Sequence, residues 1–448
     1  MRPGYLWLAS FLVFPIVGAP LLKAWAFRVF GFPTRAVLSG GVGMVLVSWT
    51  MTLFALLGIR WGPLIVLVAA AVAAALRLLP RDRVPRLPKV VPSPPGRGDG
   101  GEGAARGTTL IAYSLTALSL LAAFAATVSA RSTSTDLLLF WGPKAQQFAA
   151  ARTVDVGFLR APYLEYLHVY YPPLVTDVFA FAAMVAGRFP WGAATLTFPL
   201  FLAATSVALA GILKTEAGAA PAAATGALAT SAMALVGIHV SVAGNAEPFL
   251  LFFEILGLAV LLTPIARSTT GKLLAGLLFA GAAASKVEAL PFVGTTIALF
   301  LAVDREARRS AIRTVLLLAG PAMVSLGTWF AFGAAKKLFF GYQGYGRTLA
   351  IRWESLPAIA ADVGRSLWKV GFALPWLVPI AVLLLTPARG RRVWLPLGIA
   401  IVLAGFLLFT YATTEANVRL LISWSAARVL SPLTALLAFA SFCAREHR

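Results

Sequence analysis

Runs of about twenty apolar residues recur from one end of this chain to the other, and they limit its fold more than any other feature. A helix needs roughly 20 residues to cross about 30 Å of hydrocarbon, where it must satisfy its own backbone hydrogen bonds. Because 59% of the residues are hydrophobic and only 12% are charged, the composition excludes an ordinary soluble domain. The sequence therefore predicts an all-α polytopic membrane protein with about thirteen transmembrane helices. The predicted spans are residues 5–22, 37–57, 61–79, 109–130, 193–213, 219–240, 249–265, 272–286, 289–303, 312–333, 371–387, 393–412 and 428–444.

The formal net charge of +21 does not indicate nucleic acid as a partner, because many basic residues lie in short connections between apolar runs. Such residues hold loops on the cytoplasmic side of a membrane. The single cysteine, Cys443, excludes an intramolecular disulfide and a cysteine-based metal site. The N-terminus lacks the pattern of a cleaved secretory signal, so residues 5–22 are expected to remain as the first helix.

The distribution of basic residues also predicts a topology. The segment Arg77–Arg106, rich in Pro, Gly and basic residues, is expected to be a flexible cytoplasmic linker. The helix at 109–130 then runs outward and places Asp136 on the external face. Segment 172–187 is interpreted as a re-entrant or interfacial helix, because a full crossing there would put the basic residues 305–313 outside. The predicted external segments are 131–192, 241–248, 334–370 and 413–427.

Three parts are predicted along the chain. Residues 1–107 form a three-helix membrane module with the basic linker. Residues 108–300 form a core with a large first external loop, 131–192, that carries interfacial helices. Residues 301–448 form the C-terminal transmembrane helices with a second large external loop, 334–370.

Asp136 is the leading candidate for a catalytic group. It follows the outward helix and precedes Trp141 and Lys144 on an apparently amphipathic segment. A carboxylate at this position is suited to act as a general base toward an incoming hydroxyl. The alternative is structural, because Thr135 or Asp136 would also serve as the N-cap of a helix that begins near Leu137.

Further polar residues interrupt the apolar runs on the predicted external side. The sequence Tyr171-Pro172-Pro173-Leu174 combines an interfacial aromatic residue with a helix-start signal. Glu247 precedes a proline at the outer end of another helix, where it would bind a divalent cation, orient an acceptor or simply lie at the interface. Lys286 and Glu288 interrupt an apolar hairpin. Lys286 would contact a phosphate on a lipid carrier, or would extend to the interface as lysines at helix ends do.

External cations are numerous although a charge-driven topology does not require them, and an anionic lipid-linked substrate would give them a role. These residues are Lys336, Lys337, Arg347, Arg352, Arg419 and Arg428. His168 and His239 are isolated and do not form a metal-binding set. The sequence contains no Gly-rich phosphate loop and no Walker pattern, which disfavours an ATP-driven transporter.

The order of these elements resembles the GT-C superfamily of integral-membrane glycosyltransferases, especially the branch with protein O-mannosyltransferases and lipid A aminoarabinose transferases. The resemblance is clearest over residues 110–300 and looser elsewhere. The segments that carry it are Asp136–Ala145, Tyr171–Leu174, Asn245–Phe249, Ala284–Glu288 and Ala427–Pro432.

The resemblance implies that Asp136 is the base and Glu247 the second acid, and that Lys286 and Arg428 contact the donor phosphate. The substrate-binding residues expected beside these two cations are Trp141, Lys144, Tyr171 and Glu288. Such enzymes take their sugar from a polyprenyl-phosphate donor bound from the membrane. No cofactor follows from the sequence, and a divalent cation is the one candidate for a metal.

The functional hypothesis is therefore transfer of a monosaccharide from a polyprenyl-phosphate donor to an envelope glycan, lipid or protein acceptor. The reaction would take place at the external face of a bacterial-type inner (cytoplasmic) membrane. A transporter or flippase of a lipid-linked or anionic solute is the alternative from another class, and it would place charged groups near mid-membrane on broken helices. A polymerase or ligase that uses lipid-pyrophosphate-linked glycans is the third hypothesis, and the donor chemistry distinguishes it.

Overall fold

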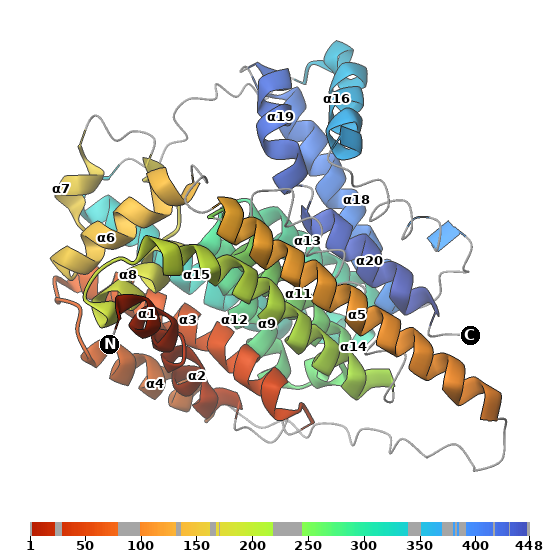
Figure 1. Cartoon of the computed structure of the whole chain (residues 1–448), viewed down its shortest axis with the longest axis horizontal. Helices are drawn as coiled ribbons and strands as arrows, with labels where there is room; N and C mark the ends of the chain where they lie inside the picture. The colour runs from red at the N-terminus through yellow and green to blue at the C-terminus, as the bar shows by residue number, and fades with distance from the viewer. Residues whose placement is uncertain are drawn as a thin grey trace.

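A computed structural model of the chain shows a bundle of helices (Figure 1). It describes residues 2–22, 29–78, 99–130, 136–161, 167–169, 171–217, 244–338, 351–369, 380, 383–384, 391–414, 417–429 and 431–445. Within these residues the structure is all-α and contains no β-strand. The predicted span 219–240 and most of 371–387 lie outside the described residues.

The helices follow one another along the chain with short connections. The α-helices are α1 (Pro3–Ser10), α2 (Val13–Leu22), α3 (Phe32–Leu57), α4 (Leu64–Leu76), α5 (Asp99–Ala130), α6 (Gly142–Ala151), α7 (Val156–Leu159), α8 (Leu174–Ala186), α9 (Trp191–Ala217), α11 (Glu247–Leu262), α12 (Thr269–Ser285), α13 (Ala289–Val303), α14 (Arg305–Arg309), α15 (Ala311–Ala335), α16 (Leu356–Lys369), α18 (Arg391–Ala412), α19 (Val418–Val429) and α20 (Ser431–Arg445). A π-helix, η2 (Asp136–Trp141), and two 3-10 helices, η4 (Pro264–Arg267) and η5 (Trp353–Ser355), complete the described elements.

Five segments are long and apolar enough to cross a membrane by their length and composition. They are Pro3–Leu22, Phe32–Leu57, Trp191–Leu213, Ala311–Ala335 and Val393–Ala412. Shorter apolar helices accompany them at Leu64–Leu76, Thr116–Ser129, Leu174–Ala186 and Ala289–Val303. This set is compatible with a multi-pass membrane protein.

Three elements differ from the predicted boundaries. The first predicted span is divided into α1 and α2, because Pro15 has no N–H with which to bond the Phe11 carbonyl one turn before it. Helix α5 begins at Asp99, inside the segment predicted as a linker, where Asp99 and Glu102 suit the positive end of a helix. Helix α19 occupies most of the predicted external loop 413–427.

The core of the bundle is rich in aromatic side chains. Helix α3 packs against α8, α9, α12 and α15, so the N-terminal helices share one core with the rest. The rings of Trp7 and Phe179 meet edge to face with centroids 5.3 Å apart, and those of Phe201 and Phe249 stack at 3.9 Å. These contacts join α1 to α8 and α9 to α11.

Basic residues gather at one end of α12 and α15. Arg267 approaches Glu306 at 3.7 Å, and the Lys272 ammonium donates to the Thr314 hydroxyl at 3.2 Å. Both connections that meet here were predicted to be cytoplasmic from their charge. Because α12 ends at Ser285, the candidate residue Lys286 lies at the opposite end of the bundle.

Candidate functional site

Helices α11 and α12 pack against each other and bring together two candidate residues that are distant in sequence. Glu247 is the first residue of α11, where a carboxylate suits the helix dipole and the following Pro248 needs no intrahelical donor. Lys286 ends α12, and its extended backbone (φ −153°, ψ 142°) turns the chain toward α13. The two side chains therefore meet where one helix begins and the other ends.

Glu247 and Lys286 form a buried salt bridge. The Lys286 Nζ lies 3.0 Å from Glu247 Oε1, and each side chain is only 7% exposed. Lys286 thus does not extend to the interface, as one sequence hypothesis had it. A buried pair of this kind is costly to desolvate and is weak evidence for a role in stability alone. Its presence at the mouth of two apolar helices makes it the centre of the candidate site.

An aromatic wall lies beside this pair. The Tyr171 hydroxyl donates to Glu288 Oε1 at 2.9 Å. The Tyr171 ring also lies 5.7 Å from the Trp141 ring and 5.2 Å from the His168 ring, centroid to centroid. The structure therefore unites Trp141, Tyr171 and Glu288, which come from three separate segments of the sequence.

Lys144 extends the cluster from the external segment. Its side chain is buried, and its Nζ lies 5.0 Å from the centroid of the Trp141 ring. Burial lowers the pKa of Lys144 to about 7, and the negative charge of Asp177 partly opposes this shift. Burial, reinforced by the positive charge of Lys144, lowers the pKa of His168 to about 4, against the influence of Glu288. Lys144, His168 and Glu288 thus share one electrostatic environment.

Asp136 begins the π-helix η2 that leads into this cluster. In a π-helix, residues five apart lie about one turn apart, so Asp136 and Trp141 share a face. Both are buried, whereas Leu138 and Leu139 between them are exposed. Asp136 is therefore part of the π-helix and faces the same side as Trp141. π-Helical turns occur frequently at functional sites.

Gly142 fixes the position of this segment against α9. A Cβ at Gly142 would lie 2.5 Å from the Leu137 carbonyl oxygen and 2.5 Å from the Trp191 ring. Only glycine allows the π-helix to continue into α6 at this close approach. The first residue of α9, Trp191, thus holds the segment that carries Asp136, Trp141 and Lys144.

The depressed pKa of Lys144 predicts a dependence of stability on pH. Between pH about 7 and 10.5, the unfolded lysine binds a proton that the folded lysine does not. The free energy of unfolding should therefore rise with pH across this window, and the gain should be lost as the pH falls toward 7. In a Lys144→Met variant this contribution should disappear. Melting curves in detergent at pH 7 to 10 measure it, and a Lys337→Met control, which removes an exposed lysine, should keep the wild-type slope.

Two buried carboxylates were not among the predicted site residues. Asp177 is 0% exposed, and its Oδ2 accepts from the hydroxyls of Ser48 at 2.8 Å and Thr52 at 3.3 Å. Glu254 is 1% exposed and lies two turns inward from Glu247 on α11. Asp177 Oδ1 and Glu254 Oε2 have no hydrogen-bond partner among the described residues. The available signal was an acid within an apolar run, which marks a functional site by default.

Arg428 is not brought to this cluster by the described contacts. It lies in α19, which packs chiefly against α16, and these two helices project together from the bundle (Figure 1). Its predicted contact with a donor phosphate remains a prediction.

The cluster provides carboxylates, ammonium groups and an aromatic wall within one end of the bundle. Such a set can bind an anionic group, stack a ring and exchange a proton. Among the residues that the structure describes, no three His, Cys, Asp or Glu side chains form a group suited to a metal ion. No protein-family model, curated protein or solved structure matches the chain.

Proposed function

We propose that the protein is a glycosyltransferase that moves a monosaccharide from a polyprenyl-phosphate donor to a hydroxyl acceptor. The observation that carries the proposal is the buried Glu247–Lys286 pair with Tyr171, Glu288 and Lys144 beside it. A GT-C-like architecture of about thirteen spans, with this cluster at the external face of a bacterial-type cytoplasmic membrane, is part of the same proposal.

The chemistry of sugar transfer matches the composition of the cluster. The acceptor hydroxyl needs a base, and Asp136 is assigned this role because it is a buried carboxylate on the face of Trp141. The departing phosphate gains negative charge, which Lys286 and Lys144 would stabilise. The aromatic wall of Trp141 and Tyr171 suits the apolar face of a sugar ring. Glu247 would hold Lys286 in place and serve as the second acid.

The direct test is a turnover assay on the purified full-length protein in detergent, without a membrane gradient. Polyprenyl-phosphate mannose, glucose and aminoarabinose are offered with and without a crude envelope acceptor fraction. Release of polyprenyl phosphate that requires the protein is the expected result. Failure of every donor to turn over, in a preparation with a normal melting transition, would contradict the proposal.

A transporter is the second candidate, and one observation favours it. Asp177 and Glu254 are buried inside apolar helices rather than at their outer ends, as in proteins that move ions or anions through a bundle. In proteoliposomes, such a protein would move a lipid-linked substrate between leaflets without consuming it. Movement without loss of the sugar–phosphate bond would decide for transport.

A further inference from the structure

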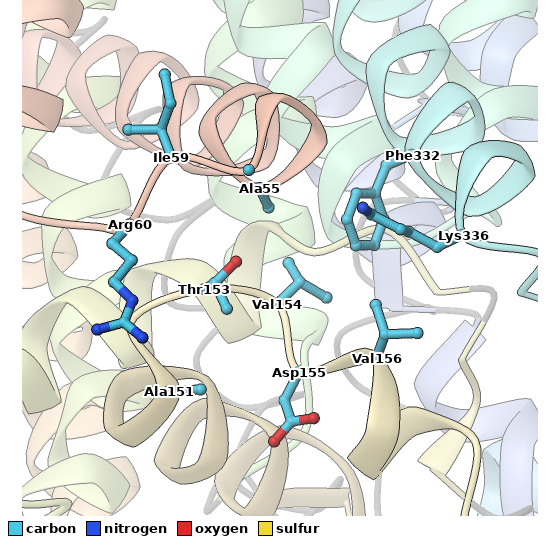
Figure 2. Close-up of a pocket in the computed structure, with 11 residues that line it drawn as sticks. Ala55, Ile59, Arg60, Ala151, Thr153, Val154, Asp155, Val156, Phe332 and Lys336 are labelled. Carbon is cyan, nitrogen blue, oxygen red and sulfur yellow. The ribbon is translucent and has the colours of Figure 1, made fainter.

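A second polar site lies away from the Glu247–Lys286 pair, at a cavity of about 500 Å³. Three segments distant in sequence surround it: the connection from α3 to α4, the connection from α6 to α7, and the end of α15. The Trp61 N–H donates to the Arg152 carbonyl at 2.7 Å and joins the first two segments. Figure 2 shows Arg60 on one wall, Lys336 on the other, and Thr153 between them.

The charges around this cavity are predominantly positive. Arg60 and Lys336 line it from opposite walls, and the Arg160 guanidinium donates to the backbone carbonyl of Lys336. Asp155 is the only acidic residue in the lining. Its carboxylate is already engaged, because Oδ1 accepts from the Phe158 N–H at 2.9 Å and Oδ2 from Gln147 at 2.8 Å. Figure 2 shows this carboxylate turned away from the Lys336 wall.

The size of the cavity restricts the ligand. Sites for small organic molecules have volumes of about 300–1,000 Å³, so this cavity accommodates more than a bare anion. The Thr153 hydroxyl and the Phe332 ring add a hydrogen-bonding group and an apolar surface to the lining. The occupant that fits is a molecule of polyol or sugar size with a phosphate that reaches Arg60 or Lys336.

The cavity is separate from the cluster but mechanically connected to it. Helix α6 carries Lys144 near its start and Ala151 at its end, about 10 Å apart along its axis at 1.5 Å per residue. The predicted topology places residues 58–60, 151–156 and 332–336 on the same external side, where basic residues are not required to set the topology.

From these observations we propose that the cavity lined by Arg60 and Lys336 is a binding site for a phosphorylated polyol. The ligand chemistry is common to a soluble glycerol phosphate and to the headgroup of phosphatidylglycerol. This site goes beyond the proposed glycosyl transfer, and binding to it can be measured without turnover.

The experiment uses the full-length protein and has two arms. In nanodiscs of phosphatidylcholine, glycerol 1-phosphate is titrated by calorimetry. In nanodiscs that also contain phosphatidylglycerol, native mass spectrometry counts the phosphatidylglycerol molecules that remain bound. Saturable binding in the first arm identifies a soluble ligand, and retention in the second identifies a lipid headgroup. Absence of saturable binding in both arms would overturn the proposal.

Variants localise the binding. An Arg60→Gln/Lys336→Gln protein should bind at least about tenfold more weakly, because each charge-assisted hydrogen bond is stronger than a neutral one. A charge-matched control, Lys337→Gln/Arg308→Gln, removes two exposed cations outside the cavity and should bind as the wild type does. Ala151→Trp tests the site without changing charge, since the indole would occupy the cavity. Wild-type affinity in both the Arg60/Lys336 and the Ala151 variants would overturn the assignment.

Discussion

Replacing Lys286 with methionine is expected to lower the free energy of unfolding by about 3–5 kcal/mol, the usual cost of removing one partner from a buried ion pair. The Glu247 carboxylate would lose the ammonium group 3.0 Å away while remaining buried. Methionine keeps most of the apolar volume of lysine, so the loss reports the charge. Thermal unfolding in detergent, with Tm converted to free energy from the calorimetric enthalpy, measures the effect.

Two variants make this result specific to the buried pair. Arg267→Met breaks an ion pair whose side chains are 54% and 66% exposed, and it should cost less than about 1 kcal/mol. A Glu247→Gln/Lys286→Met double variant should regain much of the stability lost in Lys286→Met, since no buried charge is then left uncompensated. A Lys286→Met protein that melts like the wild type would show that the carboxylate is compensated in another way.

An Asp136→Asn variant is expected to lose donor turnover by about 100- to 10,000-fold, the range for removal of a general base. Asparagine has nearly the same shape as aspartate but cannot accept a proton from the acceptor hydroxyl. The loss should appear in kcat rather than in KM for the donor, because the base acts in the transition state.

The matched control for this variant is Asp304→Asn at the opposite end of the bundle. Asp304 Oδ1 accepts from the Ala307 N–H at 2.7 Å as the N-cap of α14, and asparagine is an equally good cap. Turnover of that variant should be unchanged. Full activity in a folded Asp136→Asn protein would return Asp136 to a purely structural role at the start of η2.

The long helices are the part of the fold that the sequence predicts best. Helices α3, α9, α15 and α18 begin and end within a few residues of their predicted spans, because apolar composition is a local property of about twenty residues. The break between α1 and α2 also has a local cause, Pro15, that the apolar run concealed. Helix α19 was missed because its sequence alternates polar and apolar residues, and such a segment is also typical of an external loop.

The partners within the site could not be predicted in the same way. Glu247 and Lys286 were each candidates, but a sequence does not state which helices pack together, so their ion pair was not foreseen. Asp177 illustrates the same limit: its hydroxyl donors, Ser48 and Thr52, are more than one hundred residues away on α3. Residue types were predictable from local cost, whereas their contacts depend on tertiary packing.

For a chain that enters a bilayer while it is being synthesised, the Glu247–Lys286 contact has a consequence for biogenesis. The two residues are 39 positions apart, so α11 emerges with Glu247 and Glu254 before its partner lysine has been translated. An isolated helix with two acids is released into lipid unfavourably. We therefore expect α11 to be retained by the insertion machinery until α12 is complete, so that the two helices enter the lipid as a single hairpin.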